Sequence, residues 1–151
     1  MNSQTAANFA SLFYLGITFG RFLCGFIADK FGDKNMIRMG VATMFLGVVL
    51  VMIPVNITII QLVGLMIAGI GAAPVYPCII HATPNNFGKE NSHAIIGIQM
   101  ASAYVGSTFM PPVFGFLAEN VNIAIYPFYL LVFVVLLFVM SEKVNRVEGN
   151  R

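Results

Sequence analysis

The longest uncharged stretch of the chain runs from residue 39 to residue 88, 50 positions without Asp, Glu, Lys or Arg. As one continuous helix it would be about 75 Å long, more than twice the roughly 30 Å hydrocarbon core of a bilayer. Over the whole chain 58% of residues are hydrophobic and 9% are charged, against about 25% charged in soluble domains. The sequence therefore predicts an all-α, polytopic membrane protein in which this stretch crosses the bilayer twice.

The apolar runs predict five membrane spans in one partial transmembrane bundle of residues 1–151. Within the uncharged stretch the turn is expected at Pro54-Val55-Asn56, because proline starts turns and asparagine tolerates them. A charged turn follows the first apolar run, and Gly32 suits it because glycine adopts positive φ at little cost. The five spans are expected at about residues 7–28, 36–53, 57–81, 93–117 and 123–140.

The basic residues are distributed asymmetrically about these spans. The first loop, the third loop and the carboxyl tail hold seven of the eight: Lys30, Lys34, Arg38, Lys89, Lys143, Arg146 and Arg151. Because cytoplasmic loops are enriched in Lys and Arg, we expect these segments in the cytoplasm. The sequence thus predicts a multi-pass protein of the plasma (inner) membrane with its amino terminus outside and its carboxyl terminus cytoplasmic.

Several classes of function are disfavoured. A net charge of +2 without a basic, aromatic-rich patch argues against a nucleic-acid partner. Cys24 and Cys78 lie within apolar runs and lack metal or redox spacing, so they are interpreted as small core residues. Because no nucleophile–base pair, metal cluster or phosphate loop stands out, we expect no enzymatic activity, cofactor or metal.

The predicted spans differ in composition. The second and fifth are uniformly apolar and are expected to form an outer wall. The first carries small residues every four positions (Gly16, Gly20, Cys24, Ala28), which favour close helix contact. The third and fourth contain prolines expected to act as hinges: Pro74, Pro77, Pro111 and Pro112. Because carbonyls freed by proline persist at membrane depth only against protein or water, the first, third and fourth spans are expected to line a cavity or to pack inside the bundle.

Two charged residues of the first span lie where charge is unfavourable. Arg21 lies deep in the span, about 12 Å of helix before Asp29. It serves a function, as intramembrane charges usually do, or else it extends its long side chain toward the cytoplasmic interface or forms a structural pair. Asp29 lies at the negative pole of its own helix, so we expect it to find a cation or the amino end of another helix.

These residues resemble the loop signature of the major facilitator superfamily, which joins the second and third helices of each six-helix half. The matching residues are Gly20, Arg21, Gly25, Asp29, Lys30, Gly32 and Lys34, with Arg38 beyond them. Asp33 stands where the family usually has a basic residue. Further stretches (69–77, 83–88, 96–100 and 111–115) make the chain similar to the carboxyl half of bacterial fucose-permease-like sugar transporters.

The resemblance implies part of a secondary active transporter that works by alternating access and contacts the lipid bilayer. The five spans would be helices eight to twelve, so helix seven and the amino-terminal half would be missing partners and the chain would not be competent alone. Asp29 would close a cytoplasmic gate against that half, whereas Asn91 and Ser92 would cap the fourth helix and receive its equivalent aspartate. A non-transporting membrane remnant or an assembly subunit remains the alternative.

The expected solute is a small molecule, a sugar or a related metabolite, with a proton as the candidate coupling ion. Its candidate contacts are the polar groups of the inner spans: Tyr14, Tyr76, Gln99, Ser102 and Tyr104. Hydrogen bonds between helices would explain the same groups. His81 and His93 flank the third loop and are interpreted as interfacial. The spans hold no deeply embedded carboxylate, so a proton-coupling group is expected in the missing half.

Overall fold

A computed structural model describes residues 3–53, 58–120 and 125–149 of the chain. Their helices are α1 (Ser3–Met52), α2 (Thr58–Ala72), α3 (Val75–Phe87), α4 (Lys89–Asn120) and α5 (Tyr126–Gly149), and this part of the chain has no strand. The predicted all-α class is confirmed. The turn predicted at Pro54-Val55-Asn56 lies outside the described residues.

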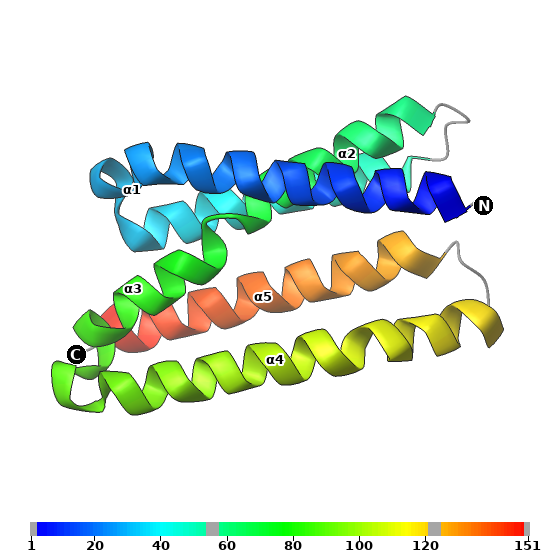
Figure 1. The fold of residues 1–151 in the computed structure, drawn as a ribbon. Coiled ribbons are helices and arrows are strands. Elements are labelled where there is room, and N and C mark those ends of the chain that lie inside the picture. Colours follow the sequence, from blue (N-terminus) through cyan, green and yellow to red (C-terminus); the bar gives the residue numbers. More distant parts are fainter. Residues whose placement is uncertain (1–2, 54–57, 121–124, 150–151) are drawn as a thin grey trace.

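Helix α1 consists of two antiparallel arms joined at Gly32 (Figure 1). Gly32 has φ 72° and ψ 156°, a backbone conformation that L-residues with a Cβ adopt only at a cost. Residues 3–31 form the first arm and residues 33–52 the second arm. The glycine expected to make this turn therefore makes it, and it reverses the chain without a longer loop.

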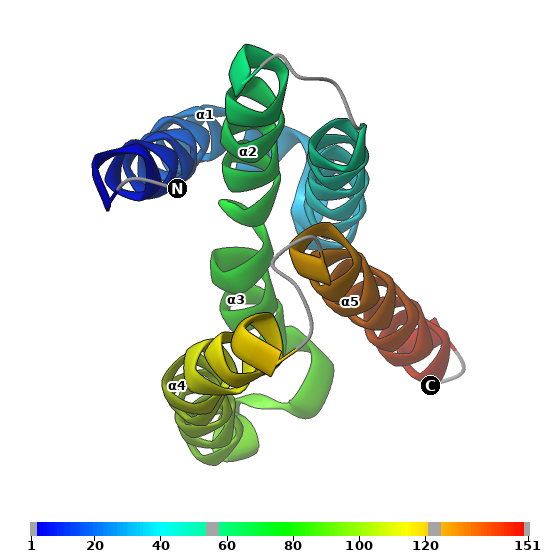
Figure 2. The ribbon, with the colours of Figure 1, turned by 90° about the vertical axis from the view of Figure 1, so that its right-hand side faces the viewer.

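Helix α2 lies between the two arms (Figure 2), and glycines bring the backbones together. A Cβ added at Gly20 of the first arm would lie 2.9 Å from the carbonyl oxygen of Ile70. A Cβ added at Gly47 of the second arm would lie 2.6 Å from the carbonyl oxygen of Gly64. Lipid tails are as apolar as leucine, so helices in a membrane gain little from burying apolar side chains against each other. Close van der Waals packing of this kind is therefore a main source of helix association in membranes. The small-residue stripe of the first span forms its expected contact at Gly16 and Gly20, both of which lack room for a Cβ.

The third predicted span divides into α2 and α3 at Ala73 and Pro74. The Ala73 amide donates to Gly69 O and Ile70 O at 3.2 and 3.3 Å, and the Cys78 amide donates to Pro74 O at 3.0 Å. These bonds satisfy backbone groups on both sides of the break. Pro77 lies in the first turn of α3, where a missing amide costs little.

The turn between α3 and α4 is shorter than the sequence predicts. Helix α3 continues to Phe87, and α4 begins at Lys89. Gly88, with φ 83° and ψ 151°, makes the connection in one residue, an option open to glycine. The prediction that α4 starts at Asn91 and Ser92 is wrong: Ser92 lies within the first turn and donates its hydroxyl to Lys89 O at 2.7 Å.

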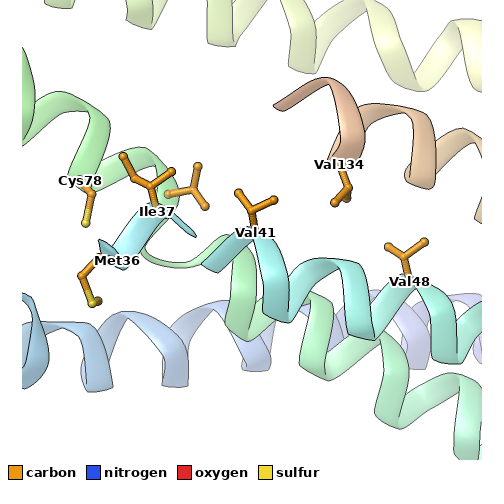
Figure 3. Close-up of a cluster of buried hydrophobic side chains, with 7 residues drawn as sticks. Met36, Ile37, Val41, Val48, Cys78 and Val134 are labelled. Carbon is orange, nitrogen blue, oxygen red and sulfur yellow. The ribbon is translucent and has the colours of Figure 1, made fainter. Parts of the chain in front are cut away.

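The buried core lies where the second arm meets α3 and α5 (Figure 3). Its members are small or flexible apolar side chains: Met36, Ile37, Val41, Val48, Val75, Cys78 and Val134. Helix α4 lies away from the first arm, on the far side of α3 (Figure 2). Tyr129 of α5 donates to Met110 O of α4 at 3.2 Å, and its ring packs against Phe114 at a tilt of 44° with the centroids 5.1 Å apart. These contacts attach α4 to α5.

Three helical segments of the described chain are long and apolar enough to cross a membrane: Lys30–Met52, Ile59–Phe87 and Tyr126–Arg146. Ser11–Ile27 is a shorter apolar segment. These four segments correspond to four of the five predicted spans. Helix α4, the fifth, is less apolar than the other four because it carries more polar residues, so its crossing of the membrane remains a prediction. The Gly32 turn, the α3–α4 turn and the end of α5 lie together at one end of the bundle (Figure 1). We call this the basic end, because the loops rich in Lys and Arg are gathered there.

Candidate functional site

The basic end is held by a bidentate ion pair between the second arm and α5. Arg38 Nε lies 2.6 Å from Glu142 Oε1, and Arg38 Nη2 lies 2.9 Å from Glu142 Oε2. The planar guanidinium matches a carboxylate in this geometry. Sequence reasoning placed Arg38 in the signature loop but missed Glu142. The available signal was an acid two residues beyond the last apolar run, at the end of the chain where the basic loops are expected.

A second polar contact joins the Gly32 turn to α3. His81 Nδ1 lies 2.9 Å from Asp33 Oδ2, with His81 largely exposed. Asp33 is the residue that departs from the family signature, and this contact gives its carboxylate a partner within the chain. His81 lies near the end of α3, in keeping with its expected place beside the third loop.

A cavity of about 720 Å³ lies between α1 and α3, and we call it the α1–α3 cavity. Its volume is within the range of roughly 300–1,000 Å³ typical of ligand pockets. The first arm contributes Arg21, Cys24 and Gly25. The remaining lining residues come from the Gly32 turn, the α2–α3 break and α3: Asp33, Pro74, Tyr76, Pro77, Cys78, Ile80 and His81. This cavity brings together more of the predicted site residues than any other feature of the described chain.

Gln99 does not line the α1–α3 cavity. Its Nε2 donates to the hydroxyl of Thr83 at 3.1 Å, and that hydroxyl donates to Ile79 O at 2.8 Å. Thr83 is only 1% exposed. The pair joins α3 to α4 beside a smaller cavity of about 250 Å³, which Lys34 also lines. The alternative interpretation of Gln99, a hydrogen bond between helices, describes its observed contact.

The other predicted site residues are dispersed. Tyr14 and Tyr104 are 67% and 72% exposed, Ser102 is exposed on α4, and none of the three lines either cavity. Pro111 and Pro112 lie within α4, which stays helical through both. Lys30 is exposed at the Gly32 turn. The side chain of Asp29 lies outside the described part of the chain.

These observations define an all-α polytopic membrane protein with a turn of charged residues, a span broken at proline and an open cavity between α1 and α3. The family model described as Major Facilitator Superfamily matches residues 1–147. The chain therefore belongs to the major facilitator superfamily and is a membrane transporter protein of that type. Comparisons with curated proteins and with solved structures found no match.

We predict that Thr83→Val destabilises the bundle by about 0.6 kcal/mol, and by no more than about 1.7 kcal/mol, the range for hydrogen bonds between membrane helices. Valine keeps the shape of threonine but removes the acceptor for Gln99. Thr43→Val is the matched control, because Thr43 donates only to Met39 O of its own helix, at 2.8 Å. Unfolding in mixed micelles measures both, and equal losses would contradict a contribution from the Thr83–Gln99 bond.

Proposed function

We propose that the chain supplies the carboxyl-terminal helices of a secondary active transporter for a small polar solute, a sugar or a related metabolite. The α1–α3 cavity carries this proposal: it has the volume of a ligand site and contains polar groups, including Arg21 and Tyr76. It also borders the break at Pro74. Broken helices near binding sites are a recurring feature of secondary transporters.

Alternating access requires one rigid bundle to move against another. The close glycine contacts between α2 and both arms give this chain a rigid unit. The first arm presents exposed aromatic side chains along its length, with Tyr14, Phe22 and Phe26 each more than 60% exposed. A second helical bundle packed on this surface would enclose the cavity and open it to one side at a time. The amino-terminal half of a major facilitator fold is the partner we propose.

The basic end is proposed to face the cytoplasm of the plasma membrane, which places the amino terminus outside and the carboxyl terminus inside. The gathering of basic loops at one end supports this orientation. In this arrangement the Gly32 turn and the Arg38–Glu142 pair lie on the cytoplasmic side. We propose that Asp29, on the same side, closes a gate against the partner half through a helix amino terminus.

Reconstitution with and without a partner half tests this function. Proteoliposomes of the 151-residue chain alone are expected to show no gradient-driven uptake of radiolabelled sugars. Co-reconstitution with the amino-terminal half from an adjacent reading frame is expected to produce uptake. Uptake by the chain alone would contradict the need for a partner, and no uptake with the partner would favour a remnant or an assembly subunit.

Asp29→Asn is predicted to slow uptake by the complete transporter at least tenfold while leaving membrane insertion unchanged. The substitution keeps the size of the side chain but removes the charge that a helix dipole would hold in the closed gate. Glu90→Gln is the matched control, since it removes one carboxylate from the other turn of the basic end. Equal uptake kinetics in wild type and Asp29→Asn would argue against a gate.

A further inference from the structure

Arg21 is the feature that points to the charge of the ligand. Its side chain lines the α1–α3 cavity together with Tyr76 and His81 of α3. The position is far from either end of the first arm, inside the apolar segment Ser11–Ile27. A guanidinium stays protonated at every physiological pH. The cavity thus carries a permanent positive charge on its wall.

The described residues provide Arg21 with no carboxylate partner. Arg38 pairs with Glu142, whereas Asp33, the acid that lines this cavity, lies against His81 at 2.9 Å. Charged groups at membrane depth pair with one another or face a water-filled cavity, and they mark pathways for substrates and ions. Arg21 is exposed in the described chain and lines this open cavity, so its guanidinium is accessible to a ligand there.

We propose that the α1–α3 cavity binds a small organic anion through its carboxylate, with Arg21 as the receptor of that group. This inference rests on the proposed transport function and narrows the solute from a polar metabolite to a carboxylate-bearing one, such as a sugar acid or a hydroxy acid. The two parallel N–H groups of a guanidinium match the two oxygens of a carboxylate. The Tyr76 hydroxyl supplies a neutral donor and acceptor on the opposite wall.

The cavity has the room and the selectivity that such a ligand needs. About 720 Å³ holds a six-carbon sugar acid with accompanying water. The apolar side of this open cavity, including Pro74, Pro77 and Ile80, lowers the number of water molecules that can solvate the charge pair. A charge-assisted bond contributes about 10- to 100-fold in affinity. A neutral sugar of the same size lacks that contribution.

Protection of a cavity thiol measures binding directly. Cys24 lies one helical turn after Arg21 and lines the same cavity. In the full chain carrying Cys78→Ala, in lipid nanodiscs, Cys24 is labelled with N-ethylmaleimide and the rate is followed by mass spectrometry. The probes are D-glucuronate and L-lactate, each compared with its neutral counterpart, D-glucose and propane-1,2-diol. We expect at least one carboxylate to slow labelling fivefold or more, and both neutral counterparts to have little effect.

The variants assign the effect to Arg21. Arg21→Gln is expected to raise the concentration of the protecting carboxylate at half-protection by about 10- to 100-fold, and Arg21→Lys by less. Arg146→Gln, which removes a cation that lines neither cavity, is expected to match the parent. The Cys78→Ala parent keeps Arg21 and Cys24, and wild-type chain labelled in parallel checks that removal of Cys78 does not itself abolish binding. Failure of both carboxylates to protect Cys24 in the parent and in the wild type overturns the proposal. Equal protection by the neutral counterparts, or protection unchanged in Arg21→Gln, also overturns it.

A carboxylate side chain of a partner half is the other source of the same chemistry. Labelling repeated with the partner half bound separates the two sources. Protection by the free carboxylate that persists in the complex supports a solute site, and protection confined to the isolated chain overturns it. Uptake of a neutral sugar without thiol protection would support the proposed transport function and contradict the anion site. Thiol protection by a carboxylate without any uptake would support the anion site and contradict the transport function.

Discussion

Gly47→Ala is expected to destabilise the helical bundle by about 1–3 kcal/mol, the usual cost of overpacking a close contact. The added methyl group would lie 2.6 Å from Gly64 O and 2.8 Å from the Cα of Ala68. Both obstacles are backbone or backbone-adjacent atoms, which cannot swing aside as a flexible side chain can. The second arm and α2 must therefore separate. Unfolding of the purified chain in mixed micelles measures the loss.

Gly97→Ala is the matched control for this experiment. Gly97 lies inside α4, and a Cβ there would meet no atom within 4 Å. Alanine is favoured over glycine in a helix by about 1 kcal/mol, so this variant is expected to be neutral or slightly stabilised. If Gly47→Ala and Gly97→Ala change stability equally, the packing of α2 against the second arm does not depend on the glycine.

Charge reversal at the basic end is the second large effect that we expect. Arg38→Glu would replace the guanidinium that faces Glu142 by a second carboxylate, where like charges disfavour one another, and would open the contact between the second arm and α5. We expect trypsin to cleave the basic end several-fold faster in Arg38→Glu than in wild type. Glu142→Arg alone is expected to behave similarly, by opposing two guanidinium groups.

The double variant Arg38→Glu/Glu142→Arg is expected to recover most of the resistance to trypsin, because it restores an ion pair with reversed polarity. The difference in cleavage rate between the single variants and wild type should become smaller at 1 M salt, where the Debye length is about 3 Å. Cleavage at Arg146 is the site to compare among variants because this residue remains in all of them, whereas Arg38→Glu removes a trypsin site and Glu142→Arg adds one. A double variant as sensitive as either single one would show that the pair does not hold α5 in place.

Much of the fold follows from residue patterns that act locally. Charge-free runs set the helical spans, and Gly32 reverses the chain at the expected position. Small residues at four-residue spacing predicted the close approach of the first arm to its neighbour. The extension of α3 to Phe87 was not predicted, because Pro84 and two asparagines argue against a helix there. The longer α3 leaves only Gly88 between α3 and α4, and this glycine makes the turn as a single residue.

Long-range pairings were less accessible from the sequence. Arg38 and Glu142 are 104 positions apart, and His81 and Asp33 are 48 apart. No local sequence spacing therefore predicts either contact. Gln99 was grouped with Tyr76 because both are polar residues of inner spans. In the structure Gln99 bonds to Thr83 and does not lie beside Tyr76. Which neighbour a side chain of α4 meets depends on how α4 packs against α3, and the sequence does not reveal that packing. Tyr76 and Arg21 do share one cavity.

The orientation of the basic end is the claim on which the gate and the access to the cavity both depend. Single cysteines at Asn120 and at Lys89, introduced with Cys24→Ala and Cys78→Ala, report it directly because these positions lie at opposite ends of α4. A membrane-impermeant maleimide applied to intact cells is expected to label Asn120→Cys, and to label Lys89→Cys only after permeabilisation. Labelling of Lys89→Cys in intact cells, with Asn120→Cys protected, would contradict the account.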